Sequence, residues 1–423
     1  MNLVKNDPRT INAWTFYDWA NSVYPLVITT AIFPIFYESV VPEKVNFFGI
    51  KLINTELYSY VVSLSFIIVA ICSPLLSGMA DYSGNKKTFM KFFCYLGALS
   101  CISLYFFSVD YIELSMLSVL LASVGFWGSL VFYNAYLPEI ATPDLHDKIS
   151  AKGFSRGYIG SSILLILCLV LIQGLGIDAR YSFVLTGLWW IGFSQITYRR
   201  LPNNVFNHQP QGNKFAKGFH ELKNVWNQLK KLKSITRYLA AFFVYSMGVQ
   251  TVMIMAIFFG TKEISWADEA SKTTGLIVSV LIIQFIAIPG AYLMAYLSGK
   301  IGNIKTLGIN IFIWIGICIG AYAVVSTPFH FYVTAGIVGF VMGGIQSLSR
   351  STYSKLLPET EDHASFFSFY DVLEKIAIVI GTFAYGFIEG LTGDMRQSIL
   401  SIIVFFILGF LLLLRIPKKE VIA

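Results

Sequence analysis

The chain has 423 residues, of which 56% are hydrophobic and only 13% are charged. Soluble globular domains carry about 25% charged residues, so this composition excludes a soluble domain and indicates a polytopic membrane protein. The formal net charge of +7 comes from basic residues that gather in loops on one side of the predicted membrane, and it implies no nucleic-acid partner.

Twelve apolar runs are long enough to cross a bilayer core of about 30 Å, and we expect each to form a transmembrane helix. The first run follows a short polar stretch and is too long for the apolar core of a cleavable leader, so we interpret it as a retained helix. The twelve runs begin near Asn12, Tyr58, Phe89, Ile112, Phe154, Tyr181, Tyr238, Gly275, Ile304, Phe329, Phe366 and Ser398.

An even number of spans places both termini on the same side, and the Lys and Arg residues indicate which side this is. Only six of the 31 basic residues fall in the odd-numbered loops, while the others lie in the two tails and the even-numbered loops. We therefore expect both termini to be cytoplasmic, and the compact chain favours a bacterial inner membrane. The six residues are Lys44, Lys51, Arg180, Lys262, Lys272 and Arg396.

The first apolar run carries a carboxylate, Asp18. An Asp inside a membrane helix costs roughly 2.5 to 3.5 kcal/mol, so such a residue is expected to face the bundle interior, a partner or a water-filled path. At helical spacing, Asp18 shares one face with Asn21, Ser22, Pro25 and Thr29. This polar face is predicted to line a cavity or a path.

The second run ends in a Gly-x-x-Asp-x-x-Gly-x-basic-basic segment, which predicts a tight turn whose Asp accepts from a helix N-terminus. A weaker copy lies 218 positions later, with Gly302, Asn303 and Lys305 in matching places and Gly299 where the Asp would stand. The residues of the first copy are Gly78, Asp81, Gly84, Lys86 and Lys87.

A second internal match supports the first one. Tyr133 and Leu137-Pro138-Glu139 at the end of the fourth run recur as Tyr353 and Leu357-Pro358-Glu359 at the end of the tenth, at an offset of 220. Two matches at nearly the same offset indicate two homologous six-helix halves in the same orientation, which is the plan of parallel-repeat transporters.

The predicted bundles cover residues 1–200 and 237–423, with a cytoplasmic linker over 201–236. Within the linker, positions 214–233 place apolar residues at helical spacing beside lysines, which is typical of an amphipathic helix on an anionic leaflet. A solvated linker and a helix that binds a regulatory partner are the alternatives. The apolar stripe consists of Phe215, Phe219, Leu222, Trp226, Leu229 and Leu232.

The segment from Gly78 to Lys87, the twelve spans and the repeat together resemble the major facilitator superfamily. Three further stretches are similar to its vacuole-effluxer-like branch, which includes the autophagy-related amino-acid effluxers and their bacterial relatives. The resemblance covers essentially the whole chain and implies an all-α integral membrane fold, with twelve transmembrane helices in two parallel-repeat six-helix bundles. The three stretches are Tyr17 to Ser22, Leu137 to Glu139 and Gly343 to Ser351.

No Gly-x-x-x-x-Gly-Lys-Ser/Thr loop, Gly-x-Ser-x-Gly elbow or His-Glu-x-x-His pair occurs in the sequence. We therefore expect no enzyme, no cofactor and no metal site, and transport would draw on an ion gradient. We hypothesise that Asp18 is the proton-coupling acid, because burial and wetting of an acid in a cavity can drive proton uptake and release. The alternative is that Asp18 tethers a cytoplasmic gate.

Charged residues at helix ends are candidates for gating. Arg156 enters the fifth helix and Glu139 leaves the fourth, so the two could form a breakable pair. Membrane anchoring of Arg156 and a solvated Glu139 are the alternative. In transporters of the resembled superfamily the loop Asp docks near the start of helix eleven, which implies the same role for Asp81.

Helix eleven itself begins with charged residues. Asp371 and Lys375 are an i, i+4 pair of favourable polarity, and this pairing leaves Glu374 over. We assign Asp371 and Glu374 to the gating candidates.

Polar residues deep in the spans are candidates for contact with a zwitterionic substrate. Arg350 shares a face with Gln346 and Tyr353 and could hold a substrate carboxylate, although snorkelling or gating explains it equally well. Interhelical hydrogen bonding, worth about 0.6 kcal/mol on average, is the alternative for the uncharged ones. The substrate-cavity candidates are Asn21, Tyr133, Asn134, Gln250, Gln346 and Arg350.

These observations predict a secondary active transporter that moves a small polar solute, an amino acid or related metabolite, by alternating access, with proton-coupled efflux as the expected mode. We expect a monomer whose partners are the substrate, protons and membrane lipids. The alternatives are an importer of another solute class, a membrane nutrient receptor on a transporter scaffold, and a lipid translocator.

Overall fold

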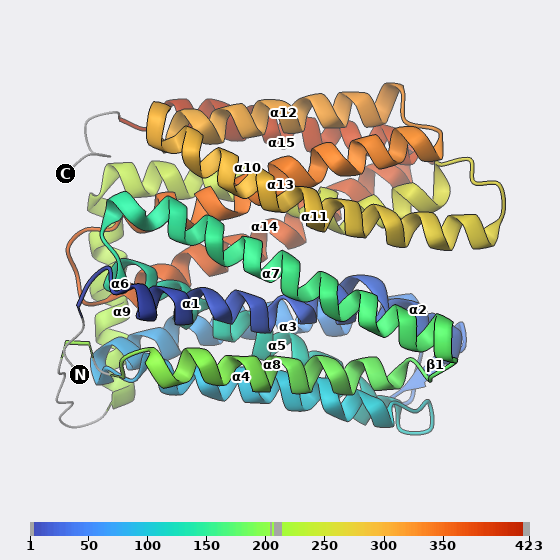
Figure 1. Cartoon of the computed structure of the whole chain (residues 1–423), viewed down its shortest axis with the longest axis horizontal. Helices are drawn as coiled ribbons and strands as arrows, with labels where there is room; N and C mark the ends of the chain where they lie inside the picture. Colours follow the sequence, from blue (N-terminus) through green and yellow to red (C-terminus); the bar gives the residue numbers. More distant parts are fainter. Residues whose placement is uncertain (1–3, 204, 207–213, 418–423) are drawn as a thin grey trace. The chain divides into compact units, whose positions relative to one another are not determined.

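The computed structural model describes residues 4–203, 205–206 and 214–417, and the side chains of all of these except 214–216. The chain forms two compact units (Figure 1). Two short segments depart from the predicted boundaries. Thr142–Ser155, predicted in the N-terminal bundle, belongs to the second unit, and Glu361–Phe369, predicted in the C-terminal bundle, belongs to the first. The first unit contains Met1–Ala141, Arg156–Val225 and Glu361–Phe369, and the second contains Thr142–Ser155, Trp226–Thr360 and Tyr370–Ala423.

In the first unit, long helices pack side by side. Helix α4 packs against α5 and α8, α8 also packs against α1, and α3 packs against α5 (Figure 1). The elements up to the linker are α1 (Pro8–Asn21), η1 (Tyr24–Ala31), α2 (Phe33–Val40), β1 (Lys44–Phe47), β2 (Ile50–Ile53), α3 (Asn54–Ser83), α4 (Lys86–Ser103), η2 (Leu104–Phe106), α5 (Ile112–Ala135), α6 (Leu137–Ile140), η3 (Pro143–Leu145), α7 (His146–Leu169), η4 (Val170–Gly174), α8 (Arg180–Arg200) and α9 (Lys214–Lys231).

In the second unit, α11 packs against α13, α12 packs against α13 and α15, and α10 packs against α15. These four contacts match the four of the first unit when helices are paired by their order in each half. The same neighbours in the same order are what a duplicated six-helix half produces, so the predicted repeat is confirmed. The elements are α10 (Lys233–Lys262), α11 (Glu269–Ile301), α12 (Asn303–Ala323), α13 (Pro328–Leu356), α14 (His363–Thr392) and α15 (Met395–Leu414).

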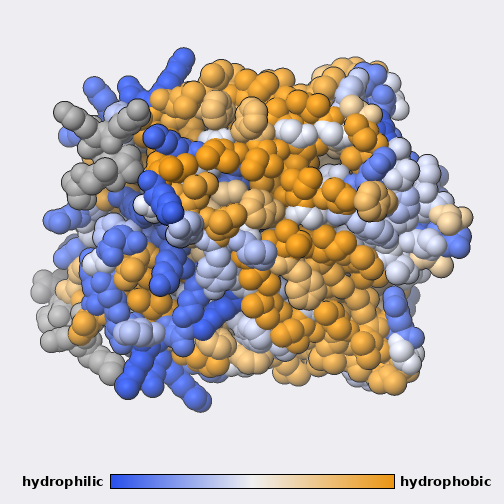
Figure 2. All heavy atoms as spheres, turned by 45° about the horizontal axis from the view of Figure 1, so that its top comes forward, coloured by the Kyte–Doolittle hydropathy of each residue, from blue (hydrophilic) through white to orange (hydrophobic). Residues whose placement is uncertain are grey.

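Ten helical stretches of the described residues are long and apolar enough to cross a membrane. Helices α8 and α14, of 21 and 30 residues, fill the remaining sixth and eleventh places of the predicted series. Hydrophobic side chains cover the middle of the helices and hydrophilic ones gather at their ends (Figure 2). Helix α7 begins at His146 rather than near Phe154, because its first turns are polar and give no hydropathy signal.

The first span is broken into three segments. Asp7 caps α1 by accepting from the N–H groups of Arg9 and Thr10, and the hydrogen bond from the Thr10 hydroxyl lowers the pKa of Asp7. Pro25 lacks the N–H that would continue the ladder, so α1 ends at Asn21 and a π-helical stretch follows. The π-helical stretch interrupts the regular spacing assumed for the polar face, with Asp18 and Asn21 buried and Thr29 exposed, and the lining of a cavity by this face stays a prediction.

A short hairpin interrupts the otherwise helical chain between α2 and α3, where sequence analysis expected only a loop. Strands β1 and β2 pair antiparallel, with Lys44 opposite Ile53 and Phe47 opposite Ile50. Phe48 and Gly49 have φ values of 47° and 84°, which is the backbone of a two-residue type I′ turn.

Candidate functional site

Asp18 is held by a buried tyrosine of the same unit. The Tyr133 hydroxyl of α5 donates to Asp18 Oδ2 at 2.7 Å, and Asp18 is only 4% exposed. Trp14, one turn before Asp18 on α1, stacks on the Tyr133 ring at 4.5 Å and donates from Nε1 to the Tyr133 carbonyl oxygen at 2.9 Å. The carboxylate and the hydroxyl are thus fixed from both helices.

Two other predicted cavity residues lie next to this pair in the chain. Asn21 is buried one turn after Asp18, and its Nδ2 has no acceptor among the described residues. Asn134 follows Tyr133 and is half-buried. The Tyr133 hydroxyl is the contact that the structure shows for Asp18, and a role for Asn21 and Asn134 at the same site stays a prediction.

Arg156 clamps α7 to the first helix. Its guanidinium donates to the Asn12 carbonyl oxygen at 2.9 Å and to Asn12 Oδ1 at 2.7 Å, also contacts the Thr15 hydroxyl, and lies 4.5 Å from the centroid of the Phe16 ring. The predicted pair with Glu139 is wrong, because Glu139 is buried with other partners.

Asp81 docks on the first turn of α14. Its Oδ1 accepts from Ala364 N–H at 3.1 Å, and its Oδ2 accepts from the N–H and the hydroxyl of Ser365 at 2.7 and 2.8 Å. The N-terminus of a helix favours a carboxylate through its free N–H groups and its dipole. This is the contact that the family resemblance implies, while its part in gating stays a prediction.

A buried ion pair completes this group. Lys86 forms an ion pair with Glu139 and lies 3.5 Å from Asp81, and His363 Nδ1 lies 3.1 Å from Glu139 Oε1. We call Asp81, Lys86, Glu139, His363 and Ser365 the Asp81 cluster. Sequence analysis missed His363. The only signal for it was its place at the start of helix eleven.

Two glycines shape the approach to the Asp81 cluster. Gly84 has φ 65°, the left-handed conformation that lets the chain turn between α3 and α4. Gly78 lies against the backbone of Gly218 in α9, so a side chain at Gly78 would push the linker helix away. Lys87 donates to the Leu201 carbonyl oxygen at 2.8 Å.

Asp362 lies just before this cluster, outside the spans. Burial, together with the neighbouring carboxylates of Asp81 and Glu221, raises the pKa of Asp362 from 3.8 to about 7. The loop before α14 therefore carries a carboxyl group that titrates near neutral pH.

The second unit holds a matching buried group that sequence analysis missed. Asp147, in the first turn of α7, accepts from the Ser298 hydroxyl at 2.7 Å, from Asn303 Nδ2 at 2.7 Å and from Lys355 Nζ at 2.6 Å. Asn303 also donates to Thr352 Oγ1 at 3.0 Å. We call Asp147, Ser298, Asn303, Thr352 and Lys355 the Asp147 cluster. The weak repeat at Gly302-Asn303 was the one sequence signal for it.

Arg350 is engaged with the start of α7 in the second unit. Its Nε donates to the Ser150 hydroxyl at 2.9 Å, its Nη2 donates to the Ser150 carbonyl oxygen at 3.1 Å, and its guanidinium lies 4.2 Å from the centroid of the Phe154 ring. Gln346, one turn earlier, is half-buried. Arg350 thus contacts the start of α7, while its predicted hold on a substrate carboxylate, with snorkelling or gating as the alternative, stays a prediction.

Glu374 has hydrogen-bond partners, although the sequence analysis had left it without one. Lys375 Nζ lies 2.8 Å from Asp371 Oδ1 and 3.1 Å from Glu374 Oε2, and Gln250 Nε2 of α10 donates to Glu374 Oε1 at 2.9 Å. The structure therefore brings a predicted cavity residue, Gln250, together with two predicted gating residues.

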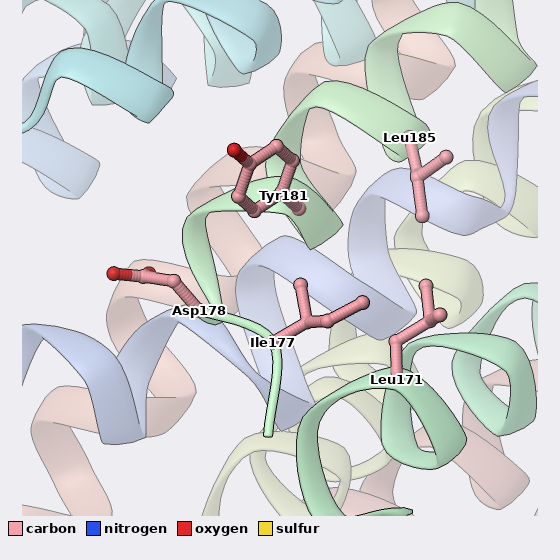
Figure 3. A pocket seen from close by; sticks show the side chains of 5 residues that line it. All are labelled: Leu171, Ile177, Asp178, Tyr181 and Leu185. Atoms are coloured by element: carbon pink, nitrogen blue, oxygen red, sulfur yellow. The ribbon is translucent and has the colours of Figure 1, made fainter. Parts of the chain in front are cut away.

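A surface cavity of the first unit lies away from the predicted cavity residues. A cavity of about 440 Å³ between the end of α7 and the start of α8 is lined by none of the predicted cavity residues (Figure 3). Its lining residues are Leu171, Ile177, Asp178, Tyr181 and Leu185. In the described residues no group of three or more His, Cys, Asp and Glu side chains is placed to hold a metal ion.

Solved structures with this fold are membrane transporters. The human organic anion transporter MFSD10 matches with a TM-score of 0.71 at 12% identity, over 96% of this chain and 100% of that one. The major facilitator superfamily transporter FucP also matches with a TM-score of 0.71 at 12% identity, over 98% and 99% of the two chains. The chain therefore has the same fold as these two solved transporters.

The family follows from the sequence match. Residues 6–421 match the family model described as vacuole effluxer Atg22 like, and the chain belongs to that family. The uncharacterized MFS-type transporter YxiO of Bacillus subtilis is 29% identical, over 99% of this chain and 97% of its own length. Autophagy-related protein 22 of Yarrowia lipolytica is 22% identical, over 89% of this chain and 78% of its own length.

Proposed function

We propose that this transporter exports a small polar metabolite, an amino acid or a close relative of one, and couples the export to protons through Asp18. The observation that carries the proposal is the buried Asp18 carboxylate that accepts from the Tyr133 hydroxyl inside a membrane span. Family membership supports the outward direction, because the family is described as effluxers.

Proton coupling needs an acid whose environment changes during the cycle. The Tyr133 hydroxyl donates to the Asp18 carboxylate. Because α1 and α5 together fix this pair, a movement of either helix would change the surroundings of Asp18. Asp18 acts as the proton carrier, and Tyr133 is its positioning residue.

Substrate contact is assigned to amide side chains of each unit. Asn21 Nδ2 is a buried donor without an acceptor among the described residues, which suits a substrate carboxylate. The half-buried Asn134, Gln250 and Gln346 are the further candidates. Arg350 is assigned to positioning α7, because its Nε and Nη2 both donate to Ser150.

The Asp81 and Asp147 clusters are assigned to the cytoplasmic gate. Each one ties the start of a helix, α14 or α7, to a unit that does not hold the rest of that helix. Opening would release the tie. Both termini would lie in the cytoplasm of a bacterial cell, with the monomer in its inner membrane.

The linker helix α9 is assigned to the anionic leaflet. Its Phe219 and Trp226 are 55% and 47% exposed, and Lys230 lies 5.0 Å from the centroid of the Trp226 ring. Leu229 is buried and does not join the exposed stripe. The side chains of Lys214 and Phe215, which belong to the predicted helix surface, lie outside the described residues.

The deciding experiment is counterflow and gradient-driven uptake of an amino-acid panel by the purified protein in liposomes. We expect accumulation under an imposed proton gradient, loss of that accumulation in Asp18→Asn, and retention of gradient-free counterflow in the same variant. Tyr133→Phe, which removes only the hydroxyl, should weaken coupling without abolishing it. Accumulation that is unchanged in Asp18→Asn would reject the proton role. Binding of an amino acid without movement would favour a receptor.

A further inference from the structure

Helix α14 carries three charged side chains where it enters the second unit, and they form one buried group. Lys375 Nζ reaches both Asp371 Oδ1, at 2.8 Å, and Glu374 Oε2, at 3.1 Å. The Lys375 and Asp371 side chains are 1% and 5% exposed, and Glu374 is 20% exposed. Two carboxylates therefore share one ammonium group away from water.

The hydrogen bonds of the group are complete at three of its four carboxylate oxygens. Lys375 serves one oxygen of each acid, and Gln250 Nε2 of α10 donates to Glu374 Oε1 at 2.9 Å. Asp371 Oδ2 is buried and accepts from no described residue. A buried carboxylate oxygen without a donor is unfavourable while the acid is charged.

Other side chains of the second unit also face the cluster. Tyr245 of α10 and Tyr370 of α14 interact electrostatically with Glu374, and Arg350 of α13 interacts with Tyr370. The Nε of Arg350 donates to the Ser150 hydroxyl. In the ion pairs of the described residues, two carboxylates of the cluster meet one ammonium group.

We propose that Asp371, Glu374 and Lys375 form a second proton-binding site of this transporter, which holds one exchangeable proton between its two carboxylates. Two like charges that share one cation in a low-dielectric site relieve their repulsion by binding a proton, and they titrate as a unit. The proton comes from water to one carboxylate oxygen and returns to water, and no other bond changes. The partly exposed Glu374 is the point of entry.

The role of this site in transport rests on the proposed proton-coupled function. Proton binding by the site can nevertheless be measured without a substrate. Infrared difference spectra of the full chain in lipid nanodiscs, taken between alkaline and acidic buffers, report the carbonyl band of a buried protonated carboxyl group. The measurement is made in an Asp18→Asn/Asp362→Asn background, which removes the proposed proton carrier and the carboxyl group of Asp362, whose pKa is about 7.

We expect one such band, which titrates with one proton per chain and disappears when Glu374→Gln or Asp371→Asn is added. Lys375→Gln should add a second proton, because the only ammonium group of the site is lost. Glu389→Gln, on the same helix, is the matched control, since Glu389 pairs with an exposed Lys262 and should leave the band unchanged.

The absence of any buried protonated carboxyl in the background protein overturns the proposal, and this outcome needs no cluster variant to fold. A band that persists after both cluster substitutions overturns it too. Intact proton binding in a protein that moves no amino acid would count against the proposed function alone, so the two failures are distinguishable.

Discussion

The Asp81 and Asp147 clusters occupy matching places in the two units, but they hold their carboxylates in opposite ways. Asp81 ends α3 and accepts from main-chain N–H groups at the start of α14. Asp147 starts α7 and accepts from side chains of α11, α12 and α13. The two halves share the place of the contact and differ in which partner carries the acid.

This difference decides which residues can be replaced. Main-chain donors remain after any side-chain substitution on α14, so the Asp81 contact depends on Asp81 and on its lysine. Side-chain donors can be removed one at a time, so the Asp147 contact is spread over several residues. The predictions below compare the two clusters from the largest expected effect to the smallest.

Lys86→Met should have the largest effect. It leaves Asp81 and Glu139 buried without an ammonium group, and we expect a loss of about 3–5 kcal/mol of stability. Lys355→Met should cost less, about 1–3 kcal/mol, because Asp147 keeps the hydroxyl of Ser298 and the amide of Asn303. Thermal unfolding of the purified variants measures both.

The double variant Lys86→Met/Glu139→Gln is the control for the charge argument. It removes one of the uncompensated carboxylates and should recover part of the lost stability. Equal losses in the Lys86 and Lys355 single variants would contradict the proposed difference between the clusters.

Asn303→Ala should cost about 2 kcal/mol, because it removes donors to Asp147 and Thr352 together. Ser365→Ala should cost only about 1 kcal/mol, since Asp81 keeps the main-chain N–H groups of Ala364 and Ser365. The same thermal assay compares them, and a more damaging Ser365→Ala would break the distinction between main-chain and side-chain donors.

The Asp81 side should also respond to pH through Asp362. Its pKa is 3.8 in the unfolded chain and about 7 when folded, so in between the folded protein keeps a proton that the unfolded chain has released. Stability should therefore fall as the pH rises from about 4 to about 7, and the contribution is lost above that range. Melting temperatures of the wild type and Asp362→Asn over this range measure the slope, which the variant should lack.

Asp268 is a control because its effect on stability should change with pH in the opposite direction. The N–H of Ser271 donates to its carboxylate and lowers the pKa of Asp268, so its stabilisation is present at neutral pH and is lost as the pH falls. A slope in Asp362→Asn that equals the wild-type slope would show that other groups cause it.

Gly299→Ala should have the smallest effect, and a favourable one. Gly299 stands where the repeat has Asp81, and an added Cβ meets no atom within 4 Å. Alanine in a helix interior is favoured over glycine by about 0.5–1 kcal/mol, so the melting temperature should rise slightly. Gly302→Ala is the matched control and should be destabilising, since Gly302 has φ 89°.

The spans could be predicted because membrane-length hydrophobicity is a local property of the chain. Helix α5 begins at Ile112, as predicted, while the polar first turns of α7 hid its true start. The repeat could be predicted because both copies kept recognisable residues in loops and helix ends. The docking of Asp81 came from a family resemblance rather than from any pattern in the residues themselves.

The partners of the charged residues could not be predicted, because they lie far apart in the chain. Asp147 meets Ser298 and Lys355 across 151 and 208 positions, and no local spacing links them. Arg156 and Glu139 lie at the ends of successive predicted helices, yet Arg156 contacts Asn12 and Glu139 pairs with Lys86. The position of two residues at successive helix ends therefore did not predict their partners, because tertiary packing determines which side chains meet.

The π-helical stretch Tyr24–Ala31 has a consequence for how the length of this span can vary. A π-helix closes each hydrogen bond over one residue more than an α-helix, so it accommodates an extra residue between two fixed flanking segments. Deleting one residue after Pro25 would shorten the π-helical stretch, and Pro25 would still interrupt the ladder of hydrogen bonds. Asp18 would stay opposite Tyr133, so natural length changes in the first span should collect in this stretch.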